Sequence, residues 1–166
     1  MKRVLLLVLL AFPLVNGFGQ EIVYPDRVIQ CLKNPKASSL KVLTDNNPYY
    51  LRGEFDGDAK PDYALQVRSK GGVTGVLVCL GNGSLQFLGA GIGGKKFSDM
   101  PEDNFVAPHW EVFTEQDVTE LSFWKHNVPD AVPVIKRREA IAMIWEDGIS
   151  LIYWDGVKFR WAGSKE

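Results

Sequence analysis

Four carboxylate side chains lie close together in the segment Glu-Phe-Asp-Gly-Asp-Ala-Lys-Pro-Asp, which spans residues 54–62. They belong to Glu54, Asp56, Asp58 and Asp62. Negative charges at this density repel one another unless a cation lies between them. Ca²⁺ takes about six to eight oxygen ligands from short, flexible loops of this kind. The spacing therefore predicts a calcium site. The alternative is an acidic turn in solvent, because turns also favour Asp and Gly.

Residues 53–67, Gly-Glu-Phe-Asp-Gly-Asp-Ala-Lys-Pro-Asp-Tyr-Ala-Leu-Gln-Val, resemble the calcium-binding motif of FG-GAP and VCBS-type repeats. That motif reads roughly D-F-N-G-D-G-x-x-D-L-A-V and runs straight into a β-strand. The resemblance implies side-chain ligands from Glu54, Asp56, Asp58 and Asp62, and a backbone carbonyl ligand from Lys60. This chain departs from the family at Glu54, where Asp is usual, and at Ala59, where Gly is usual. If Ala59 needs a left-handed backbone, the strain costs about 1–2 kcal/mol.

FG-GAP repeats usually build β-propellers, which need several four-stranded blades. This chain holds one copy of the loop and shows no internal period. We therefore transfer the metal loop to this chain and not the propeller architecture.

The first residues predict an exported protein. Lys2 and Arg3 precede an apolar run from Val4 to Val15, and small residues follow. This pattern is typical of a secretory signal peptide over residues 1–19, with cleavage after Gly17 or Gly19. The run is too short to span a bilayer, which argues against an uncleaved N-terminal membrane anchor. We also expect no membrane span in the mature chain. Residues 20–166 are then predicted to form a single β-rich domain in the periplasm or outside the cell.

The net charge bears on the class of partner, and the two cysteines bear on the disulfide content. The formal net charge is −1, with 19 basic and 20 acidic residues, which argues against a nucleic-acid partner. The basic run that ends at Arg138 is expected to be a solvated strand end. An oxidising compartment favours a disulfide between Cys31 and Cys79. Two buried free thiols are the open alternative, because both residues lie among apolar neighbours.

Turn residues and periodicity predict an α+β fold with a mostly antiparallel β-sheet. One N-terminal helix is expected over residues 25–33, because Pro25 suits a first turn and Asn34-Pro35 ends it. The Asn82-Gly83 pair is a strong hairpin signal, and two-residue turns are expected at Asp147-Gly148 and Asp155-Gly156. With a further turn at Gly71-Gly72, these turns divide the strands into two three-stranded meanders, over residues 63–68, 73–80 and 85–89 and over residues 139–146, 149–154 and 157–162.

Direct pairing across the last two turns assigns the faces of the second meander. With Glu146 opposite Ile149 and Trp154 opposite Val157, one face is almost wholly apolar. Its residues are Ile141, Met143, Trp145, Ile152, Trp154, Val157, Phe159 and Trp161. We expect the helix to cover this face, with its tryptophans packed in the core rather than exposed to a ligand. Trp110 and Trp124 are expected to be the exposed tryptophans.

The irregular middle of the chain, residues 90–138, contains the candidate catalytic residues. His109 and Glu111 lie two apart, hence on one side of a strand, and such a pair could transfer protons. The triad Gly89, Gly91 and Gly94 matches a dinucleotide fingerprint, but no helical pattern follows it, so a turn or bulge is the better interpretation.

The favoured functional hypothesis is an exported calcium-binding module that recognises a protein or glycan partner, possible forms being an inhibitor or an immunity-type protein. One alternative is a secreted enzyme that uses His109 and Glu111 as an acid/base pair. The other is a domain in which calcium only stabilises the fold.

Overall fold

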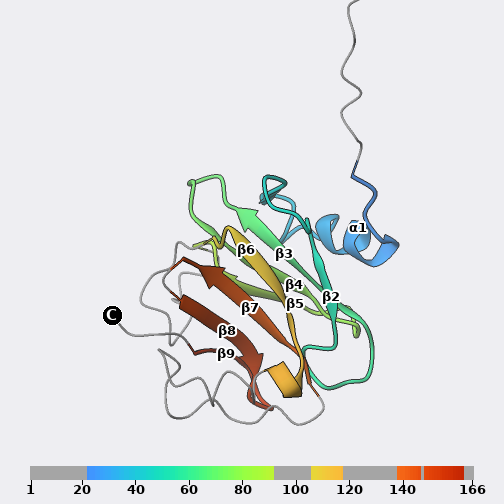
Figure 1. Cartoon of the computed structure of the whole chain (residues 1–166). Helices are drawn as coiled ribbons and strands as arrows, with labels where there is room; N and C mark the ends of the chain where they lie inside the picture. The colour runs from blue at the N-terminus through green and yellow to red at the C-terminus, as the bar shows by residue number, and fades with distance from the viewer. Residues whose placement is uncertain (1–21, 92–105, 118–137, 147, 163–166) are drawn as a thin grey trace, which may run out of the picture.

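The computed structural model describes residues 22–91, 106–117, 138–146 and 148–162, which form helix α1, a short helical stretch at residues 115–117 and two antiparallel sheets (Figure 1). The expected signal peptide, Trp124 and Gly94 lie outside the described residues. The elements, in chain order, are α1 (Asp26–Leu32), β1 (Lys41–Val42), β2 (Leu51–Gly53), β3 (Asp62–Arg68), β4 (Thr74–Cys79), β5 (Leu85–Gly89), β6 (His109–Phe113), β7 (Ala140–Trp145), β8 (Gly148–Trp154) and β9 (Phe159–Ala162).

Both predicted meanders are present, and each is part of a larger sheet. In the first sheet β3, β4 and β5 are neighbours, and β1 and β2 both pair with the other edge of β3. In the second sheet β6 is added to the meander β7-β8-β9. Strands β1 and β2 have two and three residues, which is too short for alternation to reveal them in sequence. The prediction of a mostly antiparallel fold is confirmed, and the strand count of each sheet was too low.

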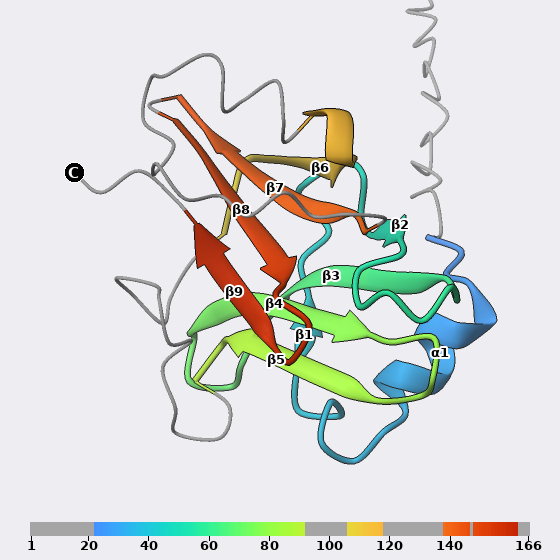
Figure 2. The ribbon, with the colours of Figure 1, turned by 90° about the horizontal axis from the view of Figure 1, so that it is seen from below.

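The two sheets pack face to face, and alternate residues of β3 and β4 point to opposite sides of the first sheet. Figure 2 shows the strands of the second sheet crossing those of the first. Ala64, Val76 and Val78 belong to the core between the sheets, whereas Leu65 and Leu77 belong to a core on the outer side. Because both faces are covered, β4 is buried along its whole length. This explains why β4 reads as a nearly continuous apolar run.

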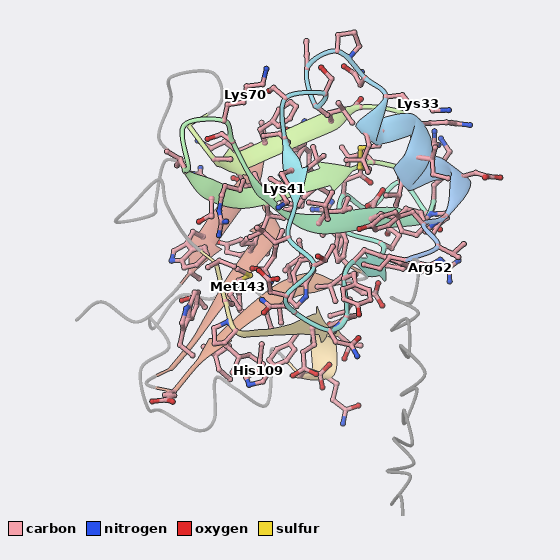
Figure 3. The ribbon with its side chains drawn as sticks, turned by 90° about the horizontal axis from the view of Figure 1, so that it is seen from above. Lys33, Lys41, Arg52, Lys70, His109 and Met143 are labelled. Atoms are coloured by element: carbon pink, nitrogen blue, oxygen red, sulfur yellow. A yellow bond between two sulfur atoms is a disulfide. The ribbon has the colours of Figure 1, made fainter. Side chains whose placement is uncertain are left out.

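Helix α1 packs on the outer side of the first sheet. Val28 and Cys31 of the helix join Leu65, Leu77 and Cys79 in one apolar cluster. A disulfide links Cys31 to Cys79, with the two Cα atoms 6.0 Å apart. Figure 3 shows the helix beside the strands of the first sheet, away from those of the second. The open alternative of two free thiols is therefore wrong for this structure.

The apolar face of the second meander is covered by the first sheet, and not by the helix as expected. Ile141, Met143 and Ile152 are fully buried in the core between the sheets. Trp145, Trp154 and Trp161 are partly buried and pack against the same core. The correction has a physical reason: an apolar strip three strands wide needs a sheet to cover it, whereas α1 has seven residues and is held on the far side by its disulfide.

The predicted register of the second meander was wrong by two residues at each turn. Ile144 pairs with Ile149, and Trp154 pairs with Phe159. A shift of two keeps every side chain on its own face, so the assignment of faces survived the error. Val157 is the exception, because it lies in the turn and is 82% exposed.

The turn between β8 and β9 is closed by Asp155. Its Oδ1 accepts hydrogen bonds from the N–H groups of Lys158 (2.9 Å) and Val157 (2.8 Å), and its Oδ2 accepts one from Arg160 Nε (2.6 Å). The bond from Lys158, followed by those from Arg160 and Val157, lowers the pKa of the Asp155 carboxyl from 3.8 to about 2.

This lowered pKa gives an expected pH dependence. A carboxyl whose folded-state pKa is lowered stabilises the fold above its ordinary pKa and loses that contribution as the pH falls toward the folded-state value. The free energy of unfolding of Asp155→Asn should therefore approach that of the wild type as the pH falls from about 4 to about 2. Urea denaturation of both proteins across this interval measures the difference. A difference that stays constant with pH would contradict the role of the ionised carboxylate.

Among the described residues, no helix has the length and apolar character needed to cross a membrane.

Candidate metal centre

The acidic loop, residues 54–61, connects β2 to β3 and is anchored in the core between the two sheets. Phe55, the second residue of the loop, is 1% exposed and packs in that core. The first residue of β3 is Asp62, whose side chain is fully buried. The loop is therefore held at both ends by buried side chains, which leaves the residues between them at the surface.

Asp62 organises the loop through its two carboxylate oxygens. Oδ2 accepts hydrogen bonds from the backbone N–H groups of Phe55 (2.7 Å) and Asp56 (3.3 Å), and Oδ1 accepts one from Gly81 N–H (2.6 Å). Burial raises the pKa of this carboxyl, although the bonds from Gly81 and Phe55 act in the opposite direction. Asp62 thus connects the end of the loop to its beginning, and connects the loop to the turn between β4 and β5.

Three of the four predicted acidic ligands come together. Within the part of the chain that the structure describes, Glu54, Asp56 and Asp58 form a group whose carboxylate oxygens, one from each residue, all lie within 4.8 Å of one another. Oxygens that bind one Ca²⁺ at about 2.3–2.6 Å can be at most about 5 Å apart, so this spread fits a single ion. All three side chains are partly exposed. Asp62 is not a member of the group.

Backbone N–H groups within the loop hold the three carboxylates in place. Gly57 N–H donates to Glu54 Oε1 (2.7 Å), Asp58 N–H to Asp56 Oδ1 (3.1 Å), and Lys60 N–H to Asp58 Oδ1 (2.9 Å). Each carboxylate thus uses one oxygen to shape the loop, and the second oxygen of Asp56 accepts a long hydrogen bond from Asn82 Nδ2 (3.4 Å). Lys60 Nζ lies 3.6 Å from Asp58 Oδ2 in an exposed ion pair, which is weak in water.

Ala59 has the left-handed backbone that its place in the motif suggested, with φ of +62°. Replacing it by Gly removes about 1–2 kcal/mol of strain, and the greater freedom of Gly in the unfolded chain offsets about 0.4–1 kcal/mol of that gain. We expect Ala59→Gly to raise the free energy of unfolding by about 0.5–1 kcal/mol, measured by urea denaturation in chelator. Ala59→Val is the matched control and should be destabilising. Equal stability of the two variants would contradict the strain.

The residues just before β7 also contact the acidic loop, which sequence reasoning missed. Glu139 Oε2 accepts a hydrogen bond from Glu54 N–H (2.7 Å), and Glu139 N–H donates to the carbonyl of Glu54 (3.0 Å). The guanidinium of Arg138 lies against Gly57, where a Cβ would come within 2.5 Å of Nε, and also donates to the carbonyl of Trp154 (3.2 Å). Arg138 is therefore not simply a solvated strand end. No local sequence pattern predicts this contact, because the two contacting segments are separated by about half of the chain.

A shallow depression of about 330 Å³ lies beside the acidic group. It is lined by Arg52, Gly53, Glu54, Ala59, Lys60, Pro61 and Glu139. Its charged residues have both signs, so the depression suits a polar partner better than an apolar one.

His109 and Glu111 lie on the same side of β6, as predicted, and both are exposed. Figure 3 shows His109 far from Arg52, which lines the depression next to the acidic loop. No described contact adds a third group to the pair. Trp110, between them, was expected to be exposed and is instead 3% exposed, with its Nε1 donating to the carbonyl of Pro48 (2.8 Å). The alternation of β6 turns Trp110 into the core between the sheets.

Comparison with protein-family models, with curated proteins and with solved structures gives no match for this chain.

Proposed function

We propose that this protein is an exported calcium-binding domain that recognises a protein or glycan partner. The observation that carries the proposal is the group of carboxylate oxygens from Glu54, Asp56 and Asp58 within 4.8 Å of one another. The resemblance of the surrounding residues to FG-GAP and VCBS-type loops supports the same ion. An all-oxygen group on an irregular loop suits Ca²⁺, which tolerates irregular geometry, better than Mg²⁺, which demands a near-ideal octahedron.

Within this proposal Asp62 has a different role from the one that the motif implied. Its carboxylate accepts three backbone N–H bonds, so we assign it to shaping the loop rather than to binding the ion. The backbone carbonyl of Lys60 remains a proposed ligand, and water would complete the coordination. Binding an ion also requires Lys60 Nζ to leave Asp58, which costs little because that ion pair is exposed.

Export is supported by the disulfide between Cys31 and Cys79, because disulfides persist in oxidising compartments. The N-terminal residues, with their basic start and apolar run, support the same location. We therefore propose that the domain acts in the periplasm or outside the cell.

The proposed partner surface is the depression next to the ion. The loop that would hold calcium forms one side of it, and Glu139, which immediately precedes β7, forms another. An ion on Glu54 would stiffen this surface through the two hydrogen bonds between Glu54 and Glu139. Binding to arrays of glycans and to candidate exported proteins, compared in calcium and in chelator, tests this part of the proposal. Equal binding in both conditions would contradict a calcium-dependent surface.

Calcium is expected to stabilise the protein, and loss of a ligand should abolish the effect. At a calcium concentration of about a hundred times the dissociation constant the gain is about 2.7 kcal/mol, which raises Tm by several degrees. Asp56→Ala and Asp58→Ala should each remove most of this rise, measured by thermal melts in calcium and in chelator.

The matched control is Asp45→Ala, which removes an exposed carboxylate outside the acidic group and should keep the full rise. If both ligand variants keep the full rise, the assignment of the site is wrong. A rise without any calcium-dependent partner would favour an ion that only stabilises the fold.

A further inference from the structure

The turn between β4 and β5 lies directly against the acidic loop. Gly81 N–H donates to Asp62 Oδ1 (2.6 Å), and Asn82 Nδ2 lies 3.4 Å from Asp56 Oδ2 in a long hydrogen bond. The guanidinium of Arg27 in α1 donates to the carbonyl of Gly81 on the other side. A chemical change in this turn would therefore act on the acidic loop.

The turn contains a dipeptide with its own chemistry. In residues 20–166, Asn82 is the one asparagine followed by glycine, and both residues are exposed. The amide nitrogen of the residue after an asparagine can attack the side-chain carbonyl of that asparagine. Glycine has no Cβ to hinder the approach and reaches the required backbone angles easily. Asn-Gly is therefore the dipeptide in which this attack meets the least steric resistance.

We propose that Asn82 is a site of spontaneous deamidation, and that the folded turn restrains the reaction. The nitrogen of Gly83 forms a bond to Cγ of Asn82 and loses its proton, which is transferred through solvent to Nδ2, while the bond from Cγ to Nδ2 breaks and ammonia leaves. Water then opens the resulting cyclic imide at either carbonyl, which yields aspartate or isoaspartate. Water is the only co-reactant, and no group is oxidised or reduced.

The restraint comes from hydrogen bonds that hold both reacting groups. Gly83 N–H, the nucleophile, donates to the carbonyl of Leu80 (2.9 Å). The side chain of Asn82 accepts a hydrogen bond from Ser84 N–H at Oδ1 (2.8 Å), which holds the carbonyl that would be attacked. The backbone of Gly83 is also fixed at φ of +95°. Cyclisation requires these bonds to break, so the reaction proceeds through an opened turn.

Deamidation would change the charge of the acidic loop. It replaces the amide donor that faces Asp56 by a carboxylate, and two carboxylates at this distance repel one another unless a cation lies between them. If the acidic loop binds calcium as proposed, the modified protein would depend more strongly on calcium for its stability. Only this consequence rests on the proposed function, and the deamidation itself does not. The dependence of the protein's stability on calcium would then increase with time, as deamidation accumulates at Asn82.

The test is peptide mapping by mass spectrometry after timed incubation in mildly alkaline buffer, with chelator present. Asn82 should gain the mass that accompanies exchange of NH₂ for OH, with isoaspartate among the products, and should do so about tenfold or more faster in urea than in the folded protein. Asn104, which precedes Phe105, is the internal control and should stay unmodified for longer. No modification at Asn82 in urea, or equal rates in both conditions, would overturn the proposal.

A second variant tests the restraint within the folded protein. Asp62→Asn weakens the anchor of Gly81 and should accelerate deamidation of Asn82 in native buffer. If the rate of deamidation at Asn82 is the same in Asp62→Asn as in the wild type, although the turn has been loosened, the claim that the folded turn slows the reaction is contradicted. Asn82→Asp mimics one product, and its calcium-induced rise in Tm should exceed that of the wild type. If deamidation occurs as expected and this rise does not, the calcium site fails while the modification site stands.

Discussion

Asp62→Ala is expected to lower the free energy of unfolding by about 3 kcal/mol in the absence of calcium. The carboxylate accepts N–H bonds from Phe55, Asp56 and Gly81, and its removal leaves these donors without a partner in or near the core. A buried donor without an acceptor costs about 1–3 kcal/mol. Part of this cost is offset, because burial of the charged carboxylate is itself unfavourable, as its raised pKa indicates.

Urea denaturation in chelator measures the effect, with Asp58→Ala as the matched control. Asp58 is partly exposed, so its loss should change the free energy of unfolding by only about 0.5 kcal/mol without calcium. Asp62→Asn keeps one acceptor oxygen and should lie between the wild type and Asp62→Ala. A small effect at Asp62 together with a large one at Asp58 would show that the structural and ion-binding roles have been assigned to the wrong residues.

Removal of the disulfide between Cys31 and Cys79, which are 48 residues apart in sequence, is expected to cost about 4 kcal/mol, because the unfolded chain regains the entropy that the closed loop had removed. The double variant Cys31→Ala/Cys79→Ala avoids leaving a lone reactive thiol. It should unfold at a correspondingly lower urea concentration. Helix α1 should be the first element to lose protection from hydrogen exchange, because the disulfide ties it to β4.

Treatment with a reductant is the control for the expected loss of stability in the double variant. It should destabilise the wild type by a similar amount and leave the double variant unchanged. The rise in Tm with calcium should persist in the double variant, because the acidic group lies on a different loop. Equal stability of the wild type and the double variant, with the bond shown by mass spectrometry to be present in the former, would contradict the expected role of the disulfide.

Local patterns determined six of the described strands, and the buried face of the second meander, from sequence. The six strands predicted for the two meanders coincide with β3, β4, β5, β7, β8 and β9 to within two residues. Alternation along β7 to β9 also assigned Ile141, Met143 and Ile152 to the covered face, even though the register was wrong by two residues. Both successes have one cause, since strand alternation has a period of two and is a property of neighbouring residues.

Part of the candidate metal site could likewise be predicted from local sequence. The spacing of Glu54, Asp56 and Asp58 is local, and the structure brings their oxygens together. Asp62 fits the same spacing but is buried as the first residue of β3, where backbone N–H groups occupy its oxygens. Spacing alone cannot separate an acid that faces solvent from one that faces the core.

By itself the sequence determined the acidic loop, the hairpins and the face that β7, β8 and β9 bury. The tertiary structure alone decided that the first sheet covers the second, that α1 lies on the outer side, and that Trp110 is buried. It also decided the contact of Arg138 and Glu139 with the acidic loop. The physical reason is that these features depend on how two sheets dock. Docking is governed by the total apolar area that each face offers, and residues far apart in the chain supply that area.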